Sequence, residues 1–218
     1  MHRNQALTAL LVLETFILFV GAPLASAGTA FPLLGAGSLG VVVTLTLVVI
    51  SPGISAKILA ALAMVLAIGS QAVRIREPSA ATIWFGHGAA LAAVIAISLV
   101  LGRVVFGPGR VTHHRIQGAI VLYLNIAIAF TSAFRLIAEL HPDAFAHYPP
   151  GQPEVAAATS MLSFSFTCLT ATGLGEILPV HPLARSLSNL ESVIGQLYLT
   201  ILLARLVTLH VASDPERS

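Results

Sequence analysis

Long, uninterrupted apolar runs constrain this chain more than any other feature of its sequence. A helix needs about 20 mostly apolar residues to cross a bilayer, and the sequence contains six runs of about that length. Short breaks such as Ser51-Pro52-Gly53 and Gly107-Pro108-Gly109 separate them, and breaks of this kind are typical of turns. The predicted spans are residues 6–24, 31–50, 54–73, 80–101, 116–140 and 186–211.

The scarcity of charge supports a membrane protein. Only 9% of the 218 residues are charged and 56% are hydrophobic, whereas ordinary globular proteins are about 25% charged. So few charges would not cover a soluble surface, and a net charge of +2 is too small to indicate a nucleic-acid partner. We therefore expect an all-α integral membrane protein in contact with lipid. All basic residues but Lys57 are arginine, which favours a bacterial origin.

The segment between the fifth and sixth runs fits no spanning helix. Residues 141–153 read as a loop, and residues 154–169 form an apolar, helix-like run that is too short to cross. Non-helical backbone at membrane depth occurs only where protein or water surrounds it. This pattern predicts a re-entrant segment.

Basic residues predict the orientation, because they gather on the cytoplasmic side of a membrane protein. With the N-terminus inside, three basic residues fall outside (Arg74, Arg76 and Arg185) and Arg135 lies within the fifth span. We therefore expect a multi-pass protein of the plasma membrane with both termini cytoplasmic. The seven basic residues then inside are Arg3, Lys57, Arg103, Arg110, Arg115, Arg205 and Arg217.

The first span has an alternative interpretation as a signal peptide. Its short basic start and the sequence Ala25-Ser26-Ala27 resemble a signal with a cleavage site. Glu14 within the run, and the length of the run, favour a retained span. Cleavage near Gly28 would leave five spans instead of six.

The segment Thr170-Ala171-Thr172-Gly173-Leu174-Gly175-Glu176 carries the chemistry. Glycines at alternate positions permit backbone dihedrals that other residues avoid, so successive carbonyls can turn the same way. After a short helix whose C-terminal end points into the membrane, such a strand offers a cation a column of oxygens that replaces its hydration shell. The negative end of the helix dipole adds to the attraction.

Residues 155–210 resemble the potassium-channel pore-loop superfamily, in particular small bacterial channels whose filter ends in T-x-G-Y-G-D followed by I-x-P. The sequence at 183–207 is similar to the inner helix of that group. The matching residues near the loop are Ser163, Phe164, Thr167, Thr170, Thr172, Gly173, Gly175, Ile177 and Pro179.

The resemblance implies a homotetramer, because one chain supplies one pore loop and the pore needs four. It implies an outer helix at 117–140, a pore helix at 153–167, and K⁺ or another monovalent cation as the permeant ion without a cofactor. Thr167 and Glu176 would brace the filter, and Gly195 would be the hinge of the gate. The filter itself would comprise Thr170, Ala171, Thr172, Gly173, Leu174 and Gly175.

Three residues depart from the family pattern. Ala171 stands where the family usually has a Thr whose hydroxyl helps to form the innermost ion site, Leu174 replaces Tyr or Phe, and Glu176 replaces Asp. These departures leave two alternatives to a potassium channel: a weakly selective cation channel, or a non-conducting scaffold or accessory subunit with a degenerate filter.

The rest of the sequence sets the domain division. We expect a four-helix membrane region at 1–111, a pore domain at 112–211 and a short cytoplasmic tail at 212–218. The fourth run contains no Lys or Arg, so we expect no voltage-sensor helix. No nucleophile–base pair, nucleotide loop or metal-ligand spacing is present in the sequence, which argues against an enzyme.

Several ionisable residues and one glycine leave alternatives open. Glu191 lies one turn before Gly195 and either braces the filter from behind or faces the cavity. Gly195 itself is either a hinge or a site of close helix packing. Glu14 needs a partner or a proton to offset its burial. Arg135 and Glu139, four residues apart, are expected to pair on one helix face.

Overall fold

The computed structural model describes residues 2–26, 113–149, 151–173 and 175–211, together with scattered residues between 65 and 107. The predicted second span at 31–50 and the tail at 212–218 lie outside the described residues. Of the predicted third span, only Val65 and Gly69 are described.

The first predicted span is helical over its whole length. Three consecutive elements follow one another without a break: α1 (His2–Phe16), the π-helical turn η1 (Ile17–Gly21) and α2 (Ala22–Ser26). The described residues between 86 and 105 are also helical. They overlap the predicted fourth span.

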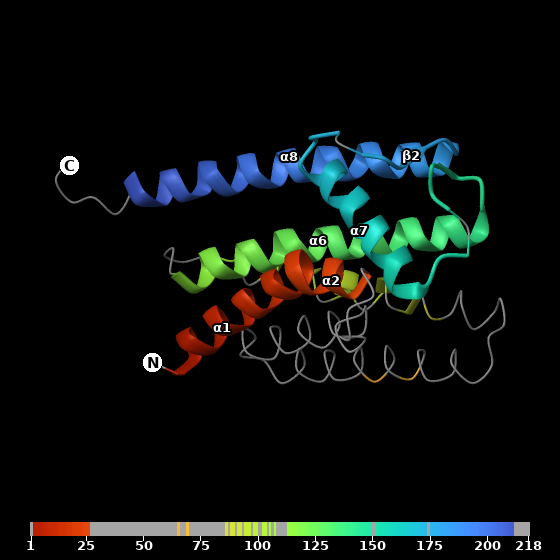
Figure 1. The fold of residues 1–218 in the computed structure, drawn as a ribbon. Helices are drawn as coiled ribbons and strands as arrows, with labels where there is room; N and C mark the ends of the chain where they lie inside the picture. The colour runs from red at the N-terminus through yellow and green to blue at the C-terminus, as the bar shows by residue number, and fades with distance from the viewer. Residues whose placement is uncertain are drawn as a thin grey trace.

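Two long helices form the frame of the C-terminal half. They are α6 (His113–Leu140) and α8 (Pro182–Val211), which lie side by side in Figure 1. Within them, Ile116–Leu140 and Pro182–Arg205 are long and apolar enough to cross a membrane. The sequence predicts a start of the sixth span at residue 186, but α8 starts four residues earlier, because Pro182 has the fixed φ that suits the first position of a helix.

A short helix, α7 (Glu154–Leu169), crosses between α6 and α8 (Figure 1). Its bounds agree with the short run predicted at 154–169. The sequence did not predict two short strands, β1 (Phe145–Ala146) after α6 and β2 (Leu178–Pro179) before α8. They pair antiparallel, with Phe145 opposite Pro179.

Aromatic packing fixes α7 against α6. The ring centroids of Phe134 and Phe164 are 4.9 Å apart, and Phe145 approaches Phe164 at 5.6 Å, both edge to face. Such pairs stabilise a core beyond the area they bury. On the other side of α7, Phe19 of η1 contacts Phe166 with centroids 5.1 Å apart, so the N-terminal helix also packs on α7.

Candidate functional site

The C-terminal end of α7 positions the glycine-containing segment through a Schellman motif. The Ala171 N–H donates to the Cys168 carbonyl at 2.9 Å, and the Thr172 N–H donates to the Thr167 carbonyl at 3.1 Å. These are the two bonds that define the motif. The residue at the left-handed position is Ala171, with φ of 53°, where glycine is usual. The segment therefore leaves the helix with a fixed direction.

Threonine hydroxyls tie the start of this segment to α7. Thr170 Oγ1 donates to the Phe166 carbonyl at 2.7 Å and lies 3.2 Å from Thr172 Oγ1. Thr167 was expected to brace the segment, and its carbonyl accepts from the Thr172 N–H. Its own hydroxyl instead donates to the Phe164 carbonyl at 2.7 Å.

Side chains from both flanking helices hold the same helix end. Ser192 Oγ on α8 donates to the Cys168 carbonyl at 2.8 Å, and Gln196 Nε2 lies 3.5 Å from the Thr170 carbonyl. From α6, Tyr123 OH lies 3.5 Å from the Leu169 carbonyl. The last carbonyls of α7, which helix geometry leaves without partners, are thus engaged by α6, α8 and the segment itself.

Gly195 is the point where α8 touches the end of α7. A Cβ at this position would lie 1.9 Å from the Leu169 carbonyl oxygen, so only glycine allows the approach. The helix α8 runs through Gly195. Close packing therefore accounts for the glycine, and its role as a hinge stays a prediction.

The segment lies deep along the helices. α7 begins at Glu154, which pairs with Arg135 on α6, and ends at Leu169, which contacts Tyr123 on α6. Arg135 and Tyr123 are twelve residues apart, which is about 18 Å of helix. The C-terminal end of α7 thus points toward the middle of the bundle, as the sequence predicted.

The two glycines have different roles in the backbone. Gly173 has φ of 67° and nothing within 4 Å of the position that a Cβ would take, whereas a Cβ on Gly175 would lie 3.2 Å from the Ile177 carbonyl oxygen. The alternating pattern predicts left-handed dihedrals at both glycines. The structure instead has them at Ala171 and Gly173, while Leu174 lies outside the described residues.

Glu191 lies against α7. Its side chain is fully buried, and its Oε1 accepts a hydrogen bond of 2.5 Å from Ser165 Oγ. Ser165 Oγ also lies 2.8 Å from the Ala127 carbonyl of α6. The structure places the Glu191 carboxylate against α7, and its role stays a prediction.

Glu176 contributes its backbone to the outer end of the site. The carboxylate is exposed and has no hydrogen bond or ion pair within the part of the chain that the structure describes. Its carbonyl lies 3.1 Å from His147 Nδ1. The bracing of the filter by Glu176 stays a prediction.

Arg135 pairs with a different residue from the one expected. Its Nη2 lies 2.5 Å from Glu154 Oε1 at the start of α7, so the expected pair with Glu139 on the same helix was wrong. The bond fixes the N-terminal end of α7 on α6. Burial raises the pKa of the nearby Tyr148 phenol, and the charge of Arg135 opposes this shift.

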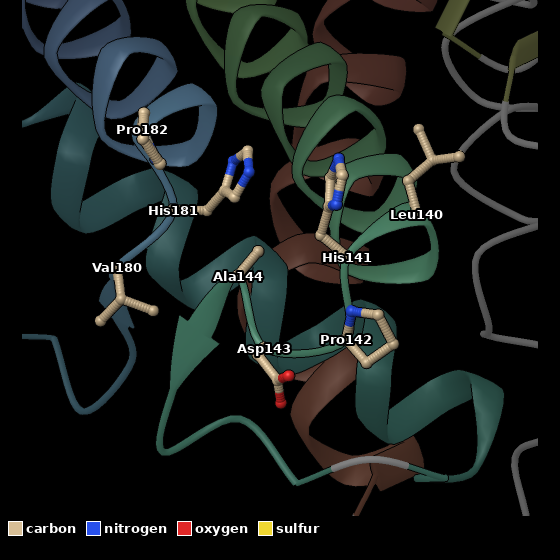
Figure 2. A pocket seen from close by; sticks show the side chains of 8 residues that line it. All are labelled: Leu140, His141, Pro142, Asp143, Ala144, Val180, His181 and Pro182. Atoms are coloured by element: carbon tan, nitrogen blue, oxygen red, sulfur yellow. The ribbon is translucent and has the colours of Figure 1, made fainter.

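A hollow of about 470 Å³ opens where α6 ends and α8 begins (Figure 2). The rings of His141 and His181 stack in it with centroids 4.4 Å apart and planes 14° apart. The Leu183 N–H donates to His181 Nδ1 at 3.2 Å, so His181 caps the N-terminus of α8. Asp143 also lines the hollow, and in Figure 2 its carboxylate points away from the two rings.

Comparison with known families decides what this arrangement is. Residues 118–211 match the family model described as "Ion channel". Residues 118–211 are an ion channel domain. This agrees with the resemblance seen in the sequence, and it places this part of the chain among channels and not among enzymes. No curated protein and no solved structure matches the chain.

The ion channel domain contains α6 from Gly118, α7, the segment after it and α8 to its last residue. Two sets of contacts within it were not found from the sequence. They are the hydroxyl and amide donors around the end of α7 and the capping histidine His181. Periodicity carries no signal for either. The donors from Ser192, Gln196 and Tyr123 depend on which helix faces which, and histidine is not among the usual N-cap residues.

Proposed function

We propose that this chain is the pore-forming subunit of a tetrameric, potassium-type cation channel that passes ions down their gradient without a cofactor. One observation carries the proposal. Thr170, Ala171, Thr172 and Gly173 are exposed in the single chain, although they lie deep along the two helices that flank them. Residues at this depth would be exposed in one chain and covered when further copies surround a common axis.

The chemistry of conduction follows from the segment and the helix before it. Backbone carbonyls replace the hydration shell of a permeant cation, and the C-terminal end of a helix adds a negative potential. With four copies, each position from Thr170 to Gly175 would supply a ring of four oxygens. Thr172 and Thr170 add hydroxyls near the inner end, where Ala171 supplies none.

The arrangement of the helices supports the proposed topology. The N-terminal ends of α1 and α6 and the C-terminal end of α8 lie at the same end of the bundle (Figure 1). This is what six spans with both chain ends in the cytoplasm require of these three. The gate would lie at this end, where the inner helices α8 of the four copies meet.

Selectivity is the finer part of the proposal. We expect a preference for K⁺, and the absence of a hydroxyl at Ala171 removes one oxygen from each subunit at the innermost site. The alternatives are a weakly selective cation pore and a non-conducting scaffold. The left-handed Ala171, which folds the segment back onto α7, is the observation that favours a degenerate filter.

Flux through liposomes tests the proposal. The purified protein is reconstituted and cation flux is measured under opposed K⁺ and Na⁺ gradients, with Gly173→Ala as the test variant. Gly151→Ala is a matched control, because Gly151 has φ of 70° against 67° for Gly173 and both have open space around a Cβ. The two changes therefore introduce similar backbone strain, but only one lies in the filter.

We expect flux that prefers K⁺, is lost in Gly173→Ala and persists in Gly151→Ala. Flux without preference would support the weakly selective pore. If the wild-type protein shows no flux, the changes Ala171→Gly and Leu174→Tyr are combined in one variant. Absence of flux in that variant too would overturn conduction and favour the scaffold. Native mass measurement in a membrane mimetic checks the assembly, and a monomer or dimer would contradict the tetramer.

A further inference from the structure

Three polar side chains on three different helices have buried oxygens without hydrogen-bond partners. Within the described residues these are both carboxylate oxygens of Glu14, Oγ of Ser98 and Oδ1 of Asn125, while the remaining such atom, Oε2 of Glu191, lies apart from them behind the filter segment. Glu14 and Asn125 are 0% exposed. The amide nitrogen of Asn125 donates to the Val121 carbonyl at 3.0 Å, so the side chain is anchored and only its oxygen is left over. Buried polar groups without partners are costly and call for an explanation.

Glu14 and Asn125 lie at similar depths on two helices that run in the same direction. Toward the N-terminal ends of the two helices, Gln117 Nε2 of α6 donates to Thr8 Oγ1 of α1 at 2.7 Å. Toward their C-terminal ends, Leu18 packs in one cluster with Leu124 and Ile128. Glu14 falls between the two contacts on its helix, and Asn125 falls between them on α6. Since both helices rise about 1.5 Å per residue, the two residues lie within about one turn of each other.

Ser98 lies at a similar depth to Glu14 and Asn125, on a helical segment that runs antiparallel to α6. Val94 belongs to the cluster of Leu18 and Ile128, and a Cβ on Gly102 would lie 3.8 Å from Leu122 of α6. The helical residues near 98 therefore run antiparallel to α6. Ser98 lies midway between Val94 and Gly102, and so opposite the stretch of α6 between Leu122 and Ile128.

Helical spacing places the three side chains on the faces that pack together. Leu11, Glu14 and Leu18 are three and four residues apart and share one face of the first span. Leu11 and Leu18 both pack on clusters that include residues of α6. Val94, Ser98 and Gly102 likewise share the face that meets α6. Glu14, Ser98 and Asn125 thus lie at a similar level of the three helices, and Glu14 and Ser98 lie on the helix faces that pack against α6.

We propose that Glu14, Ser98 and Asn125 form a binding site for one small monovalent cation, of the size of Na⁺. The donors are oxygens only, which is the set that hard cations prefer. A single carboxylate balances a single positive charge, and neutral oxygens complete the shell. An ionised carboxylate in a membrane span needs a compensating charge, and the one buried arginine among the described residues, Arg135, pairs with Glu154.

The site is separate from the filter segment and does not depend on the proposed conduction. It joins two of the first four spans to α6, the first helix of the ion channel domain. A cation bound here stabilises the packing of the N-terminal region against that domain. Removal of the cation leaves one negative charge between the three helices and weakens this packing.

Thermal unfolding of the purified full-length chain in detergent tests the site. The K⁺ concentration is held high and constant so that any K⁺ sites in the filter remain filled, and Na⁺ is titrated against an equal concentration of N-methylglucamine. A ligand that binds only the folded state raises the unfolding temperature as its concentration rises. We expect this rise in the wild type, and an apparent Na⁺ affinity that is lower by about tenfold or more in Glu14→Gln.

Ser98→Ala is the second variant, in case Glu14→Gln does not fold, and it should also weaken the response to Na⁺. Glu139→Gln is the control, because it removes an exposed carboxylate near the end of α6 and should leave the response unchanged. A Na⁺ response that is equal in the wild type, Glu14→Gln and Ser98→Ala would overturn the site. Infrared spectroscopy gives a second test. A band of a protonated carboxylic acid that is unaffected by Na⁺ and disappears in Glu14→Gln would also overturn the site, because Glu14 would then hold a proton and not a cation.

Discussion

Ser165 on α7 and Glu191 on α8 form a buried hydrogen bond of 2.5 Å, with the Ser165 hydroxyl as donor. The same hydroxyl lies 2.8 Å from the Ala127 carbonyl of α6. One side chain of the short helix therefore touches both long helices. This contact is buried among α6, α7 and α8 and so fixes the spacing of the three helices.

Ser165→Ala is expected to destabilise the domain. The change leaves Glu191 Oε1 buried without its partner, and such a loss costs about 1–3 kcal/mol. Glu191→Gln keeps an oxygen acceptor for Ser165 and should cost less. Thermal unfolding in detergent measures both, with Ser186→Ala, an exposed serine on α8, as the control. Equal unfolding temperatures for Ser165→Ala and Ser186→Ala would contradict a structural role for the bond.

Gly195→Ala is expected to disrupt the contact between α7 and α8. The new Cβ would lie 1.9 Å from the Leu169 carbonyl oxygen, and because that atom belongs to the backbone, the helices must move apart. Overpacking of this kind costs about 1–3 kcal/mol or more. The unfolding temperature should fall clearly below that of the wild type.

Gly88→Ala is the matched control for Gly195→Ala. Gly88 is also helical, and nothing lies within 4 Å of a Cβ there. Alanine in a helix is more favourable than glycine by about 1 kcal/mol, so this variant should be neutral or slightly more stable. If Gly195→Ala were as stable as Gly88→Ala but altered only channel opening, the hinge interpretation would gain over close packing.

The sequence predicted the long elements because their signal is local. The apolar lengths of α6 and α8 and the short run of α7 are visible without knowledge of their neighbours. The start of α8 at Pro182 was missed, because a search for apolar runs stops at the polar Arg185. The His181 cap and the fixed φ of Pro182 set the boundary instead. Which residue pairs with Arg135 was also missed, because Glu154 is 19 residues away in the chain.

The glycine-containing segment at 170–176 was singled out from its glycines, but its backbone conformation was not fully predicted. Left-handed dihedrals were expected only at glycines, because an L-residue with a Cβ avoids that region. Ala171 adopts it because the Schellman bonds to Thr167 and Cys168 hold it there. The tertiary contacts of Ser192 and Gln196 with the same helix end add to this restraint, and no local pattern reports them.

Ala171→Gly is expected to stabilise the local conformation. At φ of 53° an alanine is strained by about 1–2 kcal/mol relative to glycine, although the unfolded chain gains entropy with glycine, which offsets part of this. Ala171→Thr restores the family's hydroxyl but places a β-branched residue in the left-handed region, so it should lower the unfolding temperature. Parallel unfolding measurements of the two variants check the order, and a Thr variant as stable as the Gly variant would contradict it.

The cap at the start of α8 is expected to contribute to stability. His181 Nδ1 accepts the Leu183 N–H at 3.2 Å, and the His181 ring stacks on His141 with centroids 4.4 Å apart. Loss of a side-chain acceptor at the N-cap of a helix costs about 0.5–2 kcal/mol.

The variants His181→Ala and His181→Asn test this expectation. His181→Ala removes both the cap and the stack, so its unfolding temperature should fall below that of the wild type. Asparagine keeps an oxygen that caps the helix, so His181→Asn should be more stable than His181→Ala. Equal unfolding temperatures for His181→Ala and the wild type would contradict the role of the cap.

Arg205→Gln is expected to loosen the C-terminal turns of α8. Arg205 Nη1 and Nη2 donate to the carbonyls of Val105 and Gly107 at 3.3 and 2.6 Å, and hydrogen bonds from charged donors contribute about 1.5–3 kcal/mol. Hydrogen exchange along α8 measures the effect, which should appear as faster exchange after Tyr198 and little change before it. Arg185→Gln, which affects the opposite end of α8 through the Pro179 carbonyl, should show the reverse pattern. These bonds join α8 to the end of the predicted four-helix region. Faster exchange confined to the end of α8 would therefore show that Arg205 holds α8 against that region, and unchanged exchange there would contradict it.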